Sequence, residues 1–312
     1  MNKTKRTEWL DIYKGVAILL VVVGHATGLF NAFIYQFHMA AFFFISGYTT
    51  NYNKRSVPKS IYNDFLTLFL PLAVFFLGGV GSSYILNKFG LYSLFYNEGL
   101  PYLGVVDKIR IFFTSGDNYV WWLGAGWFLI VLLGIRVLHR IIYRLAGNQV
   151  TWQQTALAIG LSATGYYLIR NQIGLGFWIF SADLIFIGQL FFWLGLLLKQ
   201  SGWVEKVQTK WTIATAGVAL CALVLYGFST IRLRVDYPSR AFGNWSTDTL
   251  AALNGCLFLL FLSILLVKVP KLKKVLICMG QNSLGIVLLH FMMFKVGYLT
   301  FVILGLAPLS YL

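Results

Sequence analysis

The amino-acid sequence predicts an all-α integral membrane protein with about ten membrane-spanning helices in one bundle. Of its 312 residues, 58% are hydrophobic and only 11% are charged, whereas about 25% of the residues in a soluble domain are charged. Apolar stretches long enough to cross a bilayer recur along most of the chain. These observations exclude a soluble globular enzyme, and we expect residues 1–312 to form a single membrane-embedded domain.

Ten apolar segments, each bounded by polar or charged residues, define the predicted spans. In order, they run over residues 14–31, 35–50, 61–86, 119–138, 152–169, 174–198, 211–231, 250–267, 277–294 and 296–312. The last segment is short and contains Pro308, which makes it the weakest of the ten.

The first two segments form a predicted helix hairpin. The chain has a basic start like that of a signal peptide, but Asp11 and Lys14 precede the apolar core and His25 lies inside it. Because many spans follow, we interpret this segment as a retained signal anchor. The second segment returns after a tight turn near Asn31 and Ala32.

The later segments are joined by connections of very different length. Two long external connections, about 87–118 and 232–249, are too short to be independent domains. A glycine run at Gly78–Gly81 lies in the third span, and Asp183 lies in the sixth. No internal repeat is evident, which disfavours a transporter built from repeats.

Basic residues predict the orientation. The net charge of +15 comes from 25 Lys and Arg against 10 Asp and Glu, and it lies in short clusters between apolar segments, so we expect no nucleic-acid partner. One face holds most of the basic residues, namely Lys3, Lys5, Arg6, Lys14, Lys54, Arg55, Lys59, Arg136, Arg140, Arg144, Lys199, Lys206, Lys210, Lys268, Lys271, Lys273 and Lys274. This face is predicted to be cytoplasmic, which places both termini inside a plasma or inner cell membrane. His139, within one of these clusters, is expected to be a solvated interfacial residue.

Lys14 and His25 are the first candidate functional pair. Ten residues separate them, so on one helix His25 lies about 16 Å beyond Lys14 at 1.5 Å per residue. Lys14 is then at the cytoplasmic interface and His25 is inside the bilayer, where an ionisable group usually has a function. The alternatives are a topology anchor for Lys14 and a structural hydrogen bond for His25.

His38 is predicted to share the depth of His25. Each lies about six residues from the turn, so both imidazoles would sit about 10 Å inside the outer face. Two histidines could then line one cavity, where a neutral imidazole can remove a proton from a hydroxyl. Alternatively, His38 only binds interfacial water near the outer rim.

Several further residues are candidates for substrate binding. His290 is expected in the outer half of the membrane, although alone it resembles a structural histidine. Asp183 is expected near mid-membrane, where it needs a partner such as His25 or must be protonated. A charged group in the second long external connection could recognise an acidic or phosphorylated glycan, or could remain solvated: Arg232, Arg234, Asp236 and Arg240.

The sequence resembles the acyltransferase-3 family of transmembrane O-acyltransferases. The motifs that carry the resemblance are Leu10-Asp11-Ile12-Tyr13-Lys14-Gly15-Val16-Ala17 leading to Gly24-His25, Phe37-His38-Met39 with Phe42-Phe43-Phe44-Ile45-Ser46-Gly47-Tyr48, Trp127-Phe128-Leu129, Phe192-Trp193-Leu194-Gly195, and Gly280-Gln281-Asn282-Ser283-Leu284-Gly285 with Leu288-Leu289-His290. The first two are specific together. The resemblance extends over nearly the whole chain.

The resemblance implies transfer of an acyl group, usually acetyl, from a cytoplasmic thioester to a hydroxyl of a glycan or lipid-linked sugar. Acetyl-CoA or another acyl-CoA would be the donor substrate, with no bound cofactor and no metal. Lys14 and His25 match the family's basic residue and histidine. Either His25 removes the hydroxyl proton or it carries the acyl group transiently, and His38 is the second catalytic candidate.

Two other functions remain open at this point. In a proton-coupled transporter, His25, His38 and Asp183 would form a proton relay. In a non-catalytic membrane partner of a polysaccharide enzyme, Lys14 and His25 would be dispensable. Loss of acyl groups from a surface glycan when the chain is absent would favour the enzyme.

Overall fold

The computed structural model describes residues 7–27, 30–52, 56–92, 102–114, 120, 123–147, 151–173, 181–208, 210–230 and 235–305. Within these ranges the chain is helical apart from connections and one isolated antiparallel bridge between Asp236 and Ala241. The helices are α1 (Glu8–Thr27), α2 (Asn31–Ile34), α3 (His38–Thr49), α4 (Val57–Asp64), the π-helix η2 (Phe65–Phe69), α5 (Leu70–Lys88), α7 (Val105–Thr114), α8 (Trp127–Leu145), α9 (Trp152–Arg170), α10 (Ala182–Ser201), α11 (Trp203–Gln208), α12 (Trp211–Thr230), α13 (Trp245–Leu266), α14 (Pro270–Gln281) and α15 (Ser283–Ile303).

The predicted class, an all-α membrane protein, is confirmed. Six helices of the described chain are long and apolar enough to cross a membrane: α1, the continuous stretch from α4 through α5, α10, α12, α13 and α15. The predicted number of ten is not reached by this criterion. α3 has only 12 residues, and α8 carries the three arginines that the sequence placed at the membrane surface.

The C-terminal end differs from the prediction. Two spans were expected, over 277–294 and 296–312, but α15 runs without a break through Lys295. A single lysine does not end a membrane helix because its apolar stem can carry the ammonium group toward the interface. The break lies earlier, at Asn282, between α14 and α15. Residues 306–312 of the predicted last span lie outside the described ranges.

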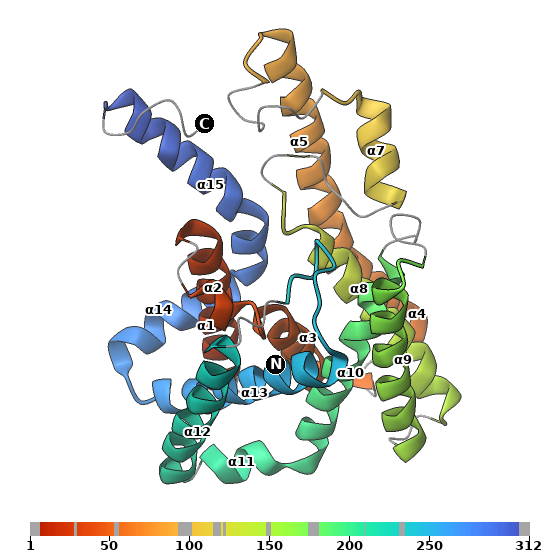
Figure 1. Cartoon of the computed structure of the whole chain (residues 1–312), viewed down its shortest axis with the longest axis vertical. Helices are drawn as coiled ribbons and strands as arrows, with labels where there is room; N and C mark the ends of the chain where they lie inside the picture. The colour runs from red at the N-terminus through yellow and green to blue at the C-terminus, as the bar shows by residue number, and fades with distance from the viewer. Residues whose placement is uncertain are drawn as a thin grey trace.

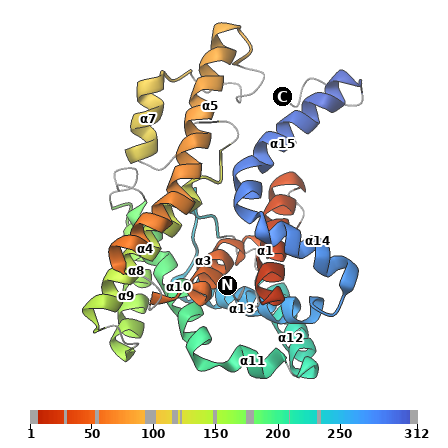
Figure 2. The same ribbon diagram turned by 180° about the vertical axis from the view of Figure 1, so that it is seen from behind.

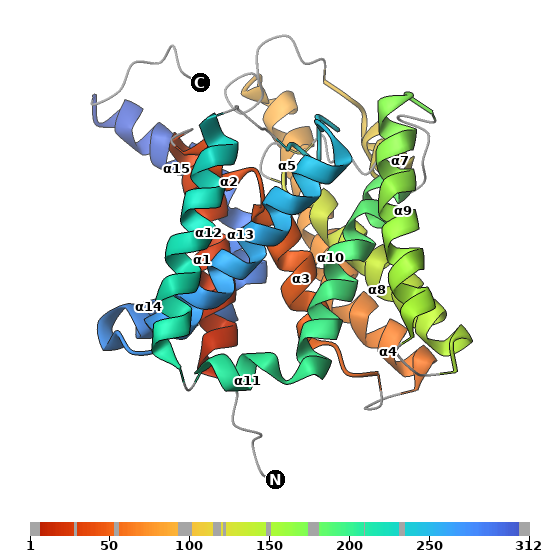
Figure 3. The same cartoon turned by 60° about the horizontal axis from the view of Figure 1, so that its bottom comes forward.

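The helices surround a core built on α1, α3, α10 and α13. In Figure 1 these four lie between α12 on one side and α8 and α9 on the other. Figure 2 shows the same bundle from behind, with α4 and α5 on one side and α14 and α15 on the other. In Figure 3 most long helices run roughly in one direction, and α11 lies across the end from which α1 starts.

Two glycines allow α3 and α10 to pack with their backbones in contact. A Cβ atom on Gly47 of α3 would collide with the carbonyl of Phe192 in α10, and one on Gly195 of α10 would collide with the carbonyl of Phe44 in α3. Close approach at small residues is how helices associate without a hydrophobic driving force. The pairing fixes α3, and with it His38, against α10.

α1 and α14 also pack closely through a glycine on each helix. Gly15 of α1 faces the carbonyl of Leu276, and Gly280 of α14 faces the carbonyl of Asp11. Beside this contact the Gln281 side-chain nitrogen donates to the Asp11 carboxylate at 3.1 Å. The first and last sequence motifs are therefore in direct contact, which sets the position of α1 along the bundle.

Candidate active site

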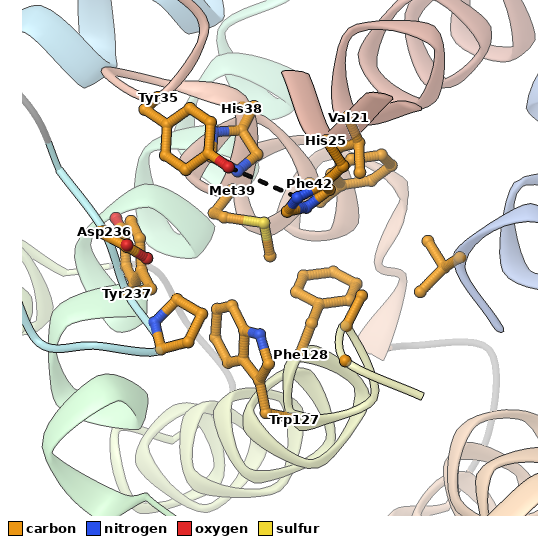
Figure 4. Close-up of a pocket in the computed structure, with 14 residues that line it drawn as sticks. Val21, His25, Tyr35, His38, Met39, Phe42, Trp127, Phe128, Asp236 and Tyr237 are labelled. Carbon is orange, nitrogen blue, oxygen red and sulfur yellow. Dashed lines mark hydrogen bonds between the residues drawn. The ribbon is translucent and has the colours of Figure 1, made fainter. Parts of the chain in front are cut away.

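An outer cavity lies where the end of α1, the start of α3 and the start of α8 meet (Figure 4). The empty space in and around its mouth is about 500 Å³, part of it open to the surroundings. Its wall is largely aromatic and apolar, with two imidazoles and one carboxylate among the lining residues: Val21, His25, Tyr35, His38, Met39, Phe42, Gly124, Ala125, Trp127, Phe128, Asp236, Tyr237, Pro238 and Val287. The prediction that His25 and His38 share a cavity is confirmed.

His25 stands in the last turn of α1 and is exposed to the cavity. Its Nδ1 atom lies 3.4 Å from the hydroxyl of Tyr35, the contact drawn as a dashed line in Figure 4. The imidazole ring is 5.4 Å from that of His290 and 4.8 Å from the ring of Phe291, measured between centroids. These aromatic neighbours hold the ring on one side and leave the cavity side open.

His38 is the first residue of α3 and is buried. Its Nδ1 atom donates to the carbonyl of Ile34 at 3.1 Å. Because a carbonyl can only accept, Nδ1 carries the proton, and Nε2 of the neutral ring keeps a lone pair. The ring also contacts Tyr35, with 4.8 Å between centroids. His38 is therefore positioned as a proton acceptor beside the tyrosine that contacts His25.

His290 belongs to the same group of imidazoles but lies behind His25. Its Nδ1 atom is 3.0 Å from the carbonyls of both Ile286 and Val287 in its own helix, and the side chain is buried. One turn earlier, Val287 lines the cavity. The geometry places His290 against the catalytic candidate His25, where it can hold the ring orientation.

Asp183 does not lie where the sequence suggested. α10 begins at Ala182, so Asp183 is in its first turn rather than near mid-membrane. Its partner is Arg240, whose Nε donates to the Asp183 carboxylate at 2.9 Å, rather than His25. Arg240 also donates from Nη2 to the Ser181 hydroxyl at 3.1 Å. The carboxylate is therefore neutralised by a cation from the external connection.

This ion pair anchors the loop whose charged residues the sequence analysis offered for glycan recognition, although the part played by Tyr237 and Pro238 was not foreseen. Asp236 and Ala241 exchange two backbone hydrogen bonds of 2.9 and 3.0 Å, which close the loop. Its tip brings Asp236, Tyr237 and Pro238 to the outer cavity, across from the two histidines in Figure 4. Only the charges of this connection were visible in the sequence. The other two candidates there, Arg232 and Arg234, lie outside the described residues.

A middle cavity adjoins the outer one on the side toward α4. Its empty space is about 670 Å³, part of it open to the surroundings. It shares three wall residues with the outer cavity, namely Phe42, Phe128 and Val287. Lys14, which is half-buried, lines it on one side and Arg136 of α8 on another. Lys14 and His25 thus face two adjoining cavities, as their separation along α1 predicts.

An inner cavity follows and shares Thr49 and Arg136 with the middle one. Its empty space is about 690 Å³, part of it open to the surroundings, and its wall is polar: Thr49, Thr50, Asn51, Ser60, Asn63, Asp64, Arg136 and Arg140. The three cavities follow one another along the bundle, and each shares wall residues with the next. This series, called here the cavity route, extends from the Arg140 end of α8 to the two histidines.

Two residues of the α8 basic cluster differ from their predicted surroundings. The sequence assigned Arg140 and His139 to a solvated interface, but both are buried. His139 lies between the aromatic rings of Tyr52, Phe192 and Trp193 and contacts Gln189 at 3.3 Å. Such contacts join distant parts of the chain, so the local pattern of charge did not predict them.

The arrangement offers acid–base groups at one end and cations at the other. Among the described residues, no three His, Cys, Asp or Glu side chains are placed to hold a metal ion. The geometry therefore suits proton transfer at the outer cavity and anion binding near the inner one.

Comparison with known proteins gives one match. A family model described as an acyltransferase domain matches residues 7–312, which is nearly the whole chain. No curated protein and no solved structure matches it.

Proposed function

Because the chain belongs to the acyltransferase-3 family, we propose that this membrane acyltransferase moves an acyl group, usually acetyl, from cytoplasmic acyl-CoA to a glycan hydroxyl. The acceptor is a cell-surface glycan or its lipid-linked precursor, and acetyl-CoA is the donor substrate rather than a bound cofactor. The observation that carries the proposal is the cavity route, a series of three adjoining cavities with basic residues at one end and two histidines at the other.

The donor enters from the cytoplasmic side. Lys14 faces the middle cavity and supplies a charge that offsets the phosphates of the donor. The thioester arm then extends past Phe42, Phe128 and Val287, which line both the middle and the outer cavity. This apolar passage suits an uncharged acyl chain and excludes the charged part of the donor.

The transfer itself occurs beside His25. The acceptor oxygen attacks the thioester carbonyl, a C–O bond forms, the C–S bond breaks, and the hydroxyl proton passes to the imidazole. The departing sulfur then takes up a proton. General acid–base groups typically contribute about 10²- to 10⁴-fold to such a step. His38, with its lone pair on Nε2, is the second proton acceptor in the same cavity.

A covalent relay uses the same groups. In that variant a ring nitrogen of His25 attacks the thioester first, and the acyl-imidazole then passes the group to the acceptor hydroxyl. His38 would remove the hydroxyl proton in the second step. Trapping of labelled acyl group on the protein in the absence of acceptor would separate the relay from direct attack.

The acceptor binds at the outer mouth. The loop tip with Asp236 and Tyr237, together with Trp127, offers a carboxylate and two large aromatic faces. The rings of Trp127 and Tyr237 are nearly parallel, at 14°, with centroids 6.1 Å apart. A sugar can pack its C–H face on such rings while the carboxylate accepts a hydroxyl.

The bilayer is the remaining partner. We propose a multi-pass protein of the plasma or inner cell membrane with a cytoplasmic N-terminus, in line with the distribution of basic residues. The exposed apolar side chains of α12 and α15 face outward from the bundle and suit contact with lipid tails.

The test is a transfer assay on purified protein in proteoliposomes. Acetyl-CoA labelled in the acetyl group is supplied with a total glycan extract, and label in the glycan is measured. The proposal predicts label transfer by the wild-type protein and about 10²- to 10⁴-fold less by a folded His25→Ala variant. Wild-type transfer by His25→Ala would contradict the catalytic role. Uptake of glycan or protons without label transfer would favour a transporter instead.

A further inference from the structure

The inner cavity holds a charge arrangement that the proposed reaction does not yet use. Arg136 and Arg140, one turn apart on α8, both face the carboxylate of Asp64 at the end of α4. The Arg136 Nη1 atom lies 2.8 Å from one carboxylate oxygen, and the Arg140 Nη2 atom lies 3.6 Å from the other. All three residues line the same cavity.

These charges are mostly withdrawn from solvent. The exposed fractions of the side chains are 24% for Arg136, 13% for Asp64 and 8% for Arg140. Among the residues that line this cavity, Asp64 is the one carboxylate and Arg136 and Arg140 are the two guanidinium groups that share it. A buried cation without a full counter-charge is costly, so this wall of the cavity favours an additional anion.

The hydrogen bonds around the cluster are incomplete. The Nε atom of Arg140 is buried and has no hydrogen-bond partner, and neither has the Oδ2 atom of Asp64. The 3.6 Å separation of Arg140 from Asp64 is too long for a hydrogen bond. By contrast, Arg136 is held on two sides, because its Nε atom donates to the Ser46 hydroxyl at 3.0 Å. The Arg140 guanidinium lies over the ring of Tyr52, 5.3 Å from its centroid, so Arg140 keeps one unpaired donor and is held less firmly by Asp64 than Arg136 is.

We propose that the inner cavity binds a phosphate or diphosphate group, with Asp64 occupying the two guanidinium groups until that anion replaces it. A guanidinium fork matches phosphate oxygens bidentately and keeps its charge at every physiological pH. Asp64 is then an internal competitor, which keeps the buried cations paired between binding events. This inference rests on the proposed function in assigning the anion to the nucleotide part of the acyl-CoA donor.

The position of the site supports this assignment. Arg136 lines both the inner and the middle cavity, so an anion held there lies where the passage toward Lys14 begins. A diphosphate bound by Arg136 and Arg140 would leave the thioester arm free to extend toward His25. An anionic lipid headgroup carries the same phosphate chemistry, and it is the competing source of the anion.

The experiment measures binding rather than turnover. Protein in nanodiscs of neutral phosphatidylcholine is titrated by calorimetry with coenzyme A, with pyrophosphate and with pantetheine, which lacks the phosphates. The variants are Arg136→Gln, Arg140→Gln and Asp64→Asn. Arg144→Gln is the matched control, because Arg144 is exposed and lies one turn beyond Arg140 on the same helix. Arg136→Lys and Arg140→Lys, which keep the charge, are included in case a glutamine variant fails to fold.

The expected results differ between the variants. Arg136→Gln and Arg140→Gln each weaken coenzyme A and pyrophosphate binding about tenfold or more, since a charge-assisted hydrogen bond contributes about 1.5–3 kcal/mol. The lysine variants give smaller losses, and Arg144→Gln changes affinity by less than about twofold. Asp64→Asn tightens both ligands by about three- to tenfold because the competing charge is gone. Pantetheine binding stays the same throughout.

Three outcomes would overturn the inference. The site is wrong if Arg136→Gln and Arg140→Gln bind pyrophosphate as tightly as Arg144→Gln does. Weaker binding in Asp64→Asn would contradict the exchange role. Loss of pyrophosphate and coenzyme A binding by the wild-type protein in phosphatidylglycerol nanodiscs would assign the site to a lipid headgroup. This experiment measures binding and not acyl transfer. The pyrophosphate result would therefore stand even if the protein did not catalyse the proposed transfer.

Discussion

The two ends of the cavity route use different kinds of polar group. At the outer end the polar wall consists of His25, His38 and Asp236 among aromatic rings. At the inner end it consists of two arginines and one aspartate among hydroxyl and amide groups. Imidazole exchanges protons near neutral pH, whereas guanidinium does not. This difference in chemistry is the basis of the proposed division of work, in which bonds are made at the outer end and charge is held at the inner end.

Removing the imidazole of His25 is expected to have the largest effect on transfer. In His25→Ala the acyl-transfer rate should fall by about 10²- to 10⁴-fold, because the hydroxyl loses its proton acceptor. Donor binding should stay within about twofold of wild type, since His25 lies at the opposite end of the route. Single-turnover kinetics and coenzyme A calorimetry measure the two effects separately. Equal losses of rate and donor affinity would show that the ends are not independent.

Narrowing the cavity route between its two ends should have the second-largest effect on acyl transfer. Val287 lines both the outer and the middle cavity, so Val287→Phe should lower transfer by at least about tenfold, as a misplaced reacting group does. Coenzyme A affinity should hardly change. Val296→Phe, on the exposed face of the same helix, is the control. Full transfer by Val287→Phe in folded protein would mean that the acyl group does not pass this residue.

A change of charge in the middle cavity should act on donor binding alone. Lys14→Gln is expected to raise the half-saturating concentration of acetyl-CoA about tenfold, because a neutral amide cannot offset phosphate charge. Lys14→Arg should retain most of the affinity, since the charge and reach survive. Steady-state titration of acetyl-CoA on all three proteins gives the comparison. A Lys14→Gln variant with normal donor affinity and no turnover would move Lys14 into the chemistry or the fold.

The smallest effect is expected at the outer loop. Arg240→Lys keeps the charge opposite Asp183 but loses the bond to Ser181. Such a lost hydrogen bond costs about 0.5–1.5 kcal/mol, so the half-saturating acceptor concentration should rise about two- to tenfold with donor affinity unchanged. Arg170→Lys, at an exposed site on α9, is the control. If acceptor affinity does not change, the loop does not help to bind the acceptor.

The outer end was more predictable from the sequence than the inner end. His25 and His38 were predicted to share one cavity because each lies about six residues from the same turn. In a helix hairpin, equal separation from the turn along the sequence places two side chains at nearly equal depth in the membrane. Asp64, Arg136 and Arg140 were not recognised as a cluster. Asp64 and Arg136 are 72 residues apart in the chain, and their contact depends on how α4 packs against α8. A repeating pattern within one helix does not predict a contact between residues so far apart in the chain.

The boundaries of the membrane spans were also only partly predictable from the sequence. The hydropathy pattern located α12 to within one residue, and it found α1 and α13 with boundaries displaced by up to six residues, because an apolar run of membrane length has few alternative structures. It failed at Lys295, where one charge suggested a break that α15 does not have. It also placed the start of the sixth span too early, which moved Asp183 away from its true position in the first turn of α10. A charged residue near a helix end is compatible with several positions of the helix boundary. The packing of the helix against its neighbours decides which position is adopted.

The central claim is that the donor is held at the Arg136 end and the acyl group is delivered at the His25 end. The most direct measurement supplies labelled acetyl-CoA to one side only of proteoliposomes in which the orientation of the protein is known, with acceptor on the other side. We expect label to reach the acceptor only when the donor is on the side from which α1 starts, which is the proposed cytoplasmic side. Equal transfer with donor on either side would contradict this account.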